Sequence, residues 1–158
     1  MFVRDFIHVG HPFEVVAPRF VTDTSWLSPI AEAAARTARE VAQSLQPASA
    51  LRGPDGGTGP PATEIRCEVG PVRARARSIL VPMWLISEGR SPALPDLSGD
   101  LEVAPVGTAR SLLALGATYR RSTHDRDHLQ RVERATEAGV RTFLSGIAAS
   151  FGGPVPAV

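Results

Sequence analysis

Hydrophobic residues recur every three or four positions in the last part of the chain, from about Asp125 to Phe151. This spacing predicts a long amphipathic helix, because residues so separated share one helix face. The sequence Gly-Gly-Pro at 152–154 should end it. A stripe of this length must be buried against a sheet or a partner. The predicted buried residues are Leu129, Val132, Thr136, Val140, Phe143, Ile147 and Phe151.

Another helix is predicted from about 29 to 45. Ser28 is suited to cap its first free amides, and Pro29 fits the first turn because it lacks an amide proton. Upstream, residues 12–20 predict only one or two helical turns, since Pro18 should end or kink a helix. The predicted buried stripe of the 29–45 helix is Ile30, Ala34, Thr37, Val41 and Leu45.

Alternating apolar and polar residues predict a series of strands. The first ten residues form one, segment 79–87 continues the series as a more apolar strand, and segments 100–105 and 110–119 complete it. Segments 64–69 and 72–77 are predicted to pair as a hairpin, with Gly70 and Pro71 in a tight turn. Because the strands follow one another and long helices lie at the ends, the pattern indicates an α+β domain instead of an alternating βαβ fold.

The chain of 158 residues is the usual size of one domain, so we expect a single domain over 1–158. Residues 46–62 are rich in glycine and proline and predict a long, flexible loop, interpreted as a tolerated insertion in preference to a cover over a site. Residues 152–158 are expected to form a short tail. Whether the loop covers a pocket stays open at this point.

Composition narrows the class of partner. Formal net charge is only +1, and the seventeen basic residues, all arginine, are interleaved with sixteen acids. A nucleic-acid-binding protein usually concentrates a basic surplus on one face, so no nucleic-acid partner is predicted. The longest apolar run, 79–86, is too short to span a bilayer. With one cysteine, Cys67, and no secretory signal pattern, we expect a cytoplasmic protein.

Few side chains suggest chemistry. His124 and His128 are spaced to share a helix face, but a metal site needs at least three converging ligands, so neither a metal nor another cofactor is predicted. His8 and His11 are candidate proton donors near the end of the first strand. Cys67 lies in the apolar register of its strand and is interpreted as an inert core thiol.

Four arginines occupy one register of adjoining strands. If that face lined a cavity, the guanidinium groups would be able to hold a carboxylate or phosphate. Alternation with apolar residues favours the other interpretation, an ordinary solvent-exposed face. The residues concerned are Arg66, Arg73, Arg75 and Arg77.

Several segments resemble strands of bacterial proteins in the START, Bet v 1 and polyketide cyclase superfamily. They are Gly70-Pro71-Val72, residues 81–84, residues 97–105 and residues 115–119. The resemblance implies a helix-grip fold, in which a curved antiparallel sheet wraps around a long C-terminal helix, with two short N-terminal helices. It also implies a cavity between that helix and the sheet for an apolar or aromatic molecule, such as a lipid or a polyketide-like compound.

The first functional hypothesis is therefore non-enzymatic binding of a hydrophobic small molecule. Gly139 and Gly146 either leave space beside Phe143 or permit close helix packing. The first alternative is a cyclase, dehydratase or hydrolase that uses His8, His11, Tyr119 or an inward arginine in the same cavity. A further alternative is an interaction module, with a possible homodimer. The candidate ligand-binding residues are Trp84, Tyr119, Val140, Phe143 and Ile147.

Overall fold

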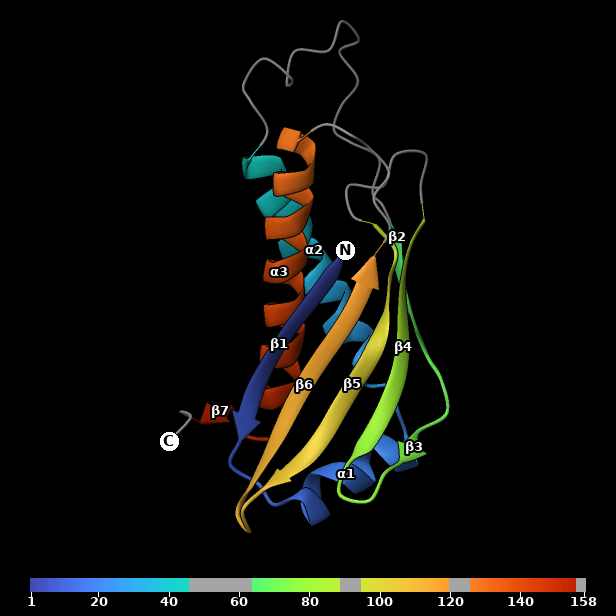
Figure 1. The fold of residues 1–158 in the computed structure, drawn as a ribbon, viewed down its shortest axis with the longest axis vertical. Coiled ribbons are helices and arrows are strands. Elements are labelled where there is room, and N and C mark those ends of the chain that lie inside the picture. The colour runs from blue at the N-terminus through green and yellow to red at the C-terminus, as the bar shows by residue number, and fades with distance from the viewer. Residues whose placement is uncertain (46–63, 89–94, 120–125, 156–158) are drawn as a thin grey trace, which may run out of the picture.

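The computed structural model describes residues 1–45, 64–88, 95–119 and 126–155 (Figure 1). The described strands form one antiparallel sheet in the order β2-β4-β5-β6-β1-β7, and β3 also pairs with β4. The elements in chain order are β1 (Phe2–Val9), α1 (Phe13–Thr22), α2 (Leu27–Ser44), β2 (Glu64–Val69), β3 (Arg73–Ala74), β4 (Ile79–Glu88), β5 (Leu97–Val106), β6 (Arg110–Tyr119), α3 (Arg126–Ala149) and β7 (Pro154–Val155).

The predicted α+β class is confirmed, and the order of elements is that of a helix-grip fold. The sheet curves past α1 and α2, and the long α3 runs beside β1 (Figure 1). The α2 helix has 18 residues, close to the length predicted for the segment 29–45. None of the described helices combines the length and hydrophobicity that crossing a membrane requires.

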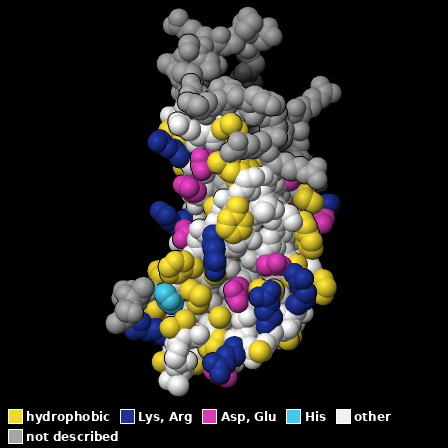
Figure 2. Space-filling view, viewed as in Figure 1, with side chains coloured by type: hydrophobic (Ala, Val, Ile, Leu, Met, Phe, Trp, Pro, Cys, Tyr) yellow, Lys and Arg dark blue, Asp and Glu magenta, His cyan; other side chains and the backbone are white. Residues whose placement is uncertain are grey.

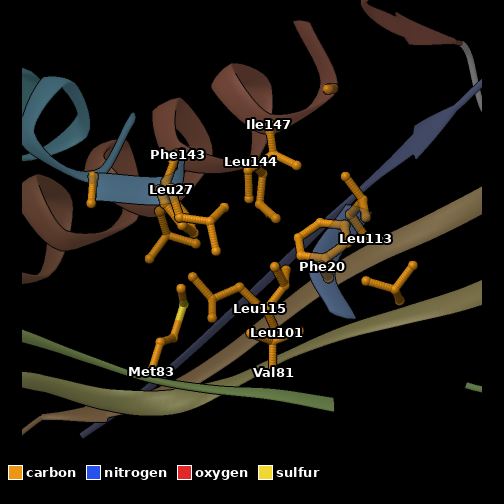
Figure 3. Packing of buried hydrophobic residues seen from close by; sticks show 14 of the residues in the cluster. Phe20, Leu27, Val81, Met83, Leu101, Leu113, Leu115, Phe143, Leu144 and Ile147 are labelled. Carbon is orange, nitrogen blue, oxygen red and sulfur yellow. The ribbon is translucent and has the colours of Figure 1, made fainter. Parts of the chain in front are cut away.

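One face of the sheet and the three helices enclose the core (Figure 3). Alternate residues of β4, β5 and β6 point toward the helices, as expected for strands with one covered face. Phe20 of α1 and Leu27 of α2 meet them from the other side. The labelled core residues of the sheet and α3 are Val81, Met83, Leu101, Leu113, Leu115, Phe143, Leu144 and Ile147.

The predicted long C-terminal helix is confirmed as α3. Its buried face matches the predicted stripe at Thr136, Val140, Phe143 and Ile147. The N-terminal part of the stripe differs, because Leu129 is only partly buried. Further along, Ala135, Leu144 and Ala148 are buried as well, so α3 contacts both α2 and the sheet.

The prediction for α2 needs two corrections. The helix begins at Leu27, and Ser28 is not its cap. The chain is already helical before Ser28: Trp26 has α-helical angles, and the amides of Leu27 and Ser28 bond to the carbonyls of Thr24 and Ser25. The buried face is also rotated from the predicted one and consists mainly of alanines, Ala31, Ala34, Ala35, Ala38 and Ala42.

The α1 helix is longer than predicted, with ten residues that include Pro18. A proline at this position removes the hydrogen bond to the carbonyl of Glu14. Both Glu14 and Pro18 lie on the exposed side, where water can solvate that carbonyl. Burial of Val16 and Phe20 on the opposite side holds the helix together through the proline.

The predicted hairpin between segments 64–69 and 72–77 is wrong. Both β2 and β3 pair with β4, along the same direction, and not with each other. Val69 opposes Met83 while Arg73 opposes Leu80, so the three residues 70–72 face two residues of β4, which is a bulge. The true hairpin joins β3 to β4, where the amide of Arg75 donates to the carbonyl of Ser78 at 2.8 Å.

Two further predictions concern the ends of elements. Residues 152–153 end α3 as predicted, with positive φ at both glycines, but the tail then forms the short strand β7 beside β1. The predicted loop 46–62 and His124 lie outside the described residues.

Candidate functional site

A narrow cleft lies where α2, α3 and the sheet meet, and it is the candidate site. Its volume is about 30 Å³. Alanines of α2 form one wall, the middle of α3 forms the second, and β4 to β6 with Pro95 form the third. The lining residues are Ala31, Ala34, Ala35, Ala38, Leu85, Pro95, Leu97, Leu115, Thr136, Gly139, Val140 and Phe143.

The described lining is apolar except for one side chain. Thr136 is 2% exposed, and its hydroxyl donates to the carbonyl of Val132 at 2.7 Å, within its own helix. Its donor is therefore already used. A molecule in this cleft would meet methyl and methylene groups and one aromatic ring, from Phe143. Such a surface selects for apolar groups, because a buried polar group without a partner costs free energy.

Small residues bring α2 and α3 close together at this site. A Cβ added at Gly139 would lie 3.0 Å from the Cβ of Ala38, and one added at Gly146 would lie 2.6 Å from Cγ2 of Ile30. Of the two roles considered for these glycines, the structure shows close helix packing. Gly139 nevertheless borders the cleft, one position from Val140.

The five candidate ligand-binding residues are not all in one place. Val140 and Phe143 line the cleft, whereas Ile147 is fully buried one turn further along α3. Tyr119 is buried at the end of β6, in register with Leu97. Trp84 was expected between the helices and the sheet, but it is 41% exposed and occupies the opposite register of β4 from Met83.

The candidate proton donors are also apart from the cleft. His8 lies on β1 with its ring 5.8 Å from that of Phe6, in an edge-to-face arrangement. The ring of His11 lies 6.4 Å from that of Phe151, beyond the end of α3. Neither histidine is among the described residues that line the cleft.

Cys67 and the arginines behave as ordinary structural residues. Cys67 is partly buried against the core, and burial raises the pKa of its thiol to about 11, so the reactive thiolate is scarce at neutral pH. The four arginines of the predicted register are exposed, as the preferred interpretation requires. Within the described residues no group of three or more potential metal ligands comes together.

Sequence reasoning did not find the alanine wall of the cleft. The signal was present in Ala31, Ala34, Ala35 and Ala38, which recur at helical spacing. Larger residues before and after them, Ile30 and Val41, shifted the predicted stripe to a neighbouring face. The contact with Gly139 of α3, which is distant in the sequence, shows that the alanines of α2 face that helix.

No protein-family model and no curated protein matches this sequence. Among solved structures, the chain is similar to the Zhui aromatase/cyclase from Streptomyces sp. R1128, with 13% identity, a TM-score of 0.42 and coverage of 96% of this chain and 93% of that one. It is also similar to the Mll3558 protein from Rhizobium loti, with 12% identity, a TM-score of 0.40 and coverage of 92% and 96%. The fold assignment rests on the element order and sheet topology described above.

Proposed function

We propose that this protein binds a small apolar molecule in the cleft between α2, α3 and the sheet. The observation that carries the proposal is the lining, in which Thr136 is the one polar side chain described and is already hydrogen-bonded. Ligand sites are predominantly apolar with a few polar groups. An alkyl chain or an uncharged aromatic ring fits this chemistry, and a buried charge does not.

The size of the cleft makes opening part of the proposal. A volume of about 30 Å³ is roughly the share of one molecule in liquid water. Sites for drug-sized ligands are about 300 to 1,000 Å³. The helices therefore have to separate from each other or from the sheet to admit a ligand. When the two helices separate, alanine methyl groups and glycine residues lose few dispersion contacts. We therefore expect α2 and α3 to separate most easily here.

We prefer a binding function to a catalytic one because the described lining of the cleft contains no acidic or basic side chain. A cyclase or dehydratase needs at least one acid or base within hydrogen-bond reach of its substrate. His8 and His11 lie elsewhere, and Tyr119 is not among the lining residues. A hydrophobic ligand can be held without such groups.

Native mass spectrometry and thermal denaturation test the proposal. The probes are decan-1-ol and naphthalene, an uncharged alkyl chain and an uncharged aromatic ring. Binding is expected to add the mass of the probe and to raise the melting temperature, because the ligand binds only the folded chain. Neither a mass shift nor a thermal shift with either probe would contradict the proposal.

Two matched variants locate the site. Ala35→Leu fills the cleft from the α2 side, whereas Ala42→Leu makes the same change in the same helix outside the lining. Each is expected to lose about 1 to 3 kcal/mol of stability from overpacking. Ala35→Leu alone should lose the ligand-induced shift. Equal binding by both variants would place the ligand elsewhere.

A further inference from the structure

The sheet has a second surface feature, on the face turned away from the helices, which we call the outer face. It carries a shallow depression of about 370 Å³ over β4, β5 and β6. Trp84, which the core does not use, stands at one side of it. The lining residues are Arg73, Pro82, Trp84, Ser98, Gly99, Asp100, Gly116 and Thr118.

Strand register places a second aromatic ring across from Trp84. Trp84 pairs with Ser98, Ser98 with Thr118, and Thr118 with Phe2, so the four form one row across β4, β5, β6 and β1. Phe2 is 63% exposed. Three strand spacings, roughly 14 Å, separate the Cα atoms of these two residues. Two exposed aromatic residues thus stand on either side of two small hydroxyl residues.

Glycines hold the rings in place and keep the floor low. A Cβ at Gly70 would lie 3.0 Å from Cζ3 of Trp84, so the bulge at 70–72 gives this ring room to lie against the backbone. A Cβ at Gly116 would lie 3.5 Å from Cζ of Phe2. The rings of Trp84 and Phe2 therefore lie against glycine backbone, and Gly116 adds no side chain to the floor of the depression.

The charges around Trp84 are balanced. Asp100 is paired with Arg73 at 2.7 Å, and Glu68, which is opposite Trp84 in register, is paired with Arg66 at 2.6 Å. Acidic and basic side chains are mixed with hydrophobic ones over the surface seen in Figure 2. Because each of these two acids is already paired with an arginine, a cationic ligand is not favoured.

We propose that this depression, together with Phe2, binds a linear chain of neutral sugar rings. A pyranose has an apolar C–H face that stacks on an aromatic ring and a rim of hydroxyls that donate and accept. Trp84 and Phe2 supply the rings, the Arg73–Asp100 pair supplies donors and acceptors, and Ser98 and Thr118 lie between. The separation of the two aromatic platforms requires several linked rings.

A second copy of this chain fits the depression less well. In a two-fold contact about an axis along the strands, β4 would face β1 of the partner and β5 would face β6. Trp84 would then meet the partner's Phe2, and the low floors would face each other unfilled. A slender occupant that lies between the rings makes better contact.

Saturation-transfer NMR tests the proposal with the intact chain and three neutral hexasaccharides: cellohexaose, hexa-N-acetylchitohexaose and mannohexaose. At about 10 mM sugar, a millimolar Kd gives nearly full occupancy. At least one sugar should receive saturation at its ring protons. Trp84→Ala should weaken binding about tenfold, and Phe2→Ala should weaken it about threefold. Phe6→Ala is the control, since Phe6 is an exposed ring on the same face but pairs with Ala114, outside the row of Trp84 and Phe2.

Three results would overturn this proposal. The first is no transfer to any of the three sugars. The second is binding that Trp84→Ala and Phe2→Ala leave unchanged. The third is a dimer in sedimentation velocity that Trp84→Ala converts to monomer, because a second copy would then occupy the face. None of these results bears on the cleft, since its residues lie on the other side of the sheet.

Discussion

The contact between α2 and α3 differs along its length. Near the start of α2 and the end of α3, large rings from Phe20, Trp26 and Phe151 fill the space between α1 and the two longer helices. In the middle, alanines of α2 face Gly139 of α3, and the narrow cleft remains. The same pair of helices is thus closed by aromatic residues at one end and by small residues further along.

The aromatic end is tied by several kinds of interaction. Ring centroids of Phe20 and Trp26 are 5.1 Å apart, and those of Phe20 and Phe151 are 6.3 Å apart. The guanidinium of Arg19 lies 4.7 Å from the Trp26 centroid and 5.1 Å from that of Phe151, and it donates to the carbonyl of Ser150 at 2.9 Å. We call Arg19, Phe20, Trp26 and Phe151 the aromatic cluster.

We infer from this difference that the proposed opening takes place at the cleft and not at the aromatic cluster. Separation of the helices at the aromatic cluster would expose large ring surfaces, and each such residue buries about 150 to 250 Å². Separation at the cleft would expose methyl groups of alanines. The cluster therefore serves as the fixed end about which the proposed opening takes place.

Deleting the same ring at the two places tests this contrast. Phe20→Ala, in the cluster, should cost about 4 to 5 kcal/mol of unfolding free energy, and Phe143→Ala, at the cleft, about 3 kcal/mol. Both residues are fully buried, at 0% and 1% exposure. The helices beside Phe143 have small side chains and can move into the space, whereas the rings around Phe20 cannot. Urea denaturation at neutral pH measures both.

The contrast would be broken if Phe143→Ala cost as much as Phe20→Ala. Rigid packing at the cleft would then argue against opening there. Leu113→Ala is a useful reference, because Leu113 is also fully buried and belongs to neither place.

A second prediction compares the two glycines of α3. Gly146→Ala places a Cβ 2.6 Å from Cγ2 of Ile30, a branched and stiff side chain, and should cost about 1 to 2 kcal/mol despite the higher helix propensity of alanine. At Gly139 the added Cβ meets Ala38 at 3.0 Å, so a shift of a few tenths of an ångström suffices. Gly139→Ala should therefore change stability by less than about 0.5 kcal/mol.

A second substitution, at Ile30, tests whether the loss in Gly146→Ala comes from the collision with that side chain. Ile30→Ala removes the atom that the new Cβ would meet, so Gly146→Ala should become nearly neutral in that background. Denaturation of the two single variants and the double variant supplies the cycle. Purely additive losses would show that Ile30 is not the cause.

A third prediction concerns the cation in the aromatic cluster. Arg19→Met retains much of the side-chain length but removes the guanidinium from Trp26 and Phe151, and should cost about 0.5 to 1 kcal/mol. Arg141→Met is the control: its exposed ion pair with Asp5, at 3.3 Å, should be worth less than about 0.5 kcal/mol. If urea denaturation gave equal losses of unfolding free energy for the two variants, Arg19 would contribute no more than an ordinary surface ion pair.

Prediction succeeded for elements whose residues by themselves indicate the structure that they form. Segment 110–119 is a mainly apolar run, and β6 has the predicted bounds. The period of α3 alone identifies four of its buried residues. In α3 one face is apolar and the other polar, so the buried side follows from the pattern.

Prediction failed where a feature depends on contact between two segments that are distant in the sequence. The run from Ile79 to Ile86 is apolar on both faces, so its sequence does not show that Trp84 points away from the helices. The bulge at 70–72 depends on pairing with β4, and Gly70-Pro71 looks the same in a tight turn. The role of Gly139 and Gly146 depends on how closely α2 approaches α3, because small residues are consistent with either open space or close packing.

The smallest predicted effect lies beside the aromatic cluster, at Asp23. The amide and the hydroxyl of Ser25 each donate to the Asp23 carboxylate at 2.8 Å, and these bonds lower the pKa of that carboxyl from its ordinary value of 3.8. The carbonyl of Asp23 also accepts the indole N–H of Trp26 at 2.8 Å, which links this turn to the cluster. A lowered pKa stabilises the fold above the ordinary value, and that stabilisation is lost as the pH falls through the folded-state pKa.

Asp23→Asn should therefore be slightly less stable than the parent at neutral pH, and the two should converge as the pH falls below 3.8. Because the carboxylate is fully exposed, the gap should be small. Urea denaturation of both proteins at several values from about pH 3 to 7, followed by tryptophan fluorescence, measures it. A gap that stays constant across this range would mean that the Ser25 bonds do not favour the charged carboxylate. The turn would then support the cluster through the Trp26 indole bond, which the substitution leaves in place.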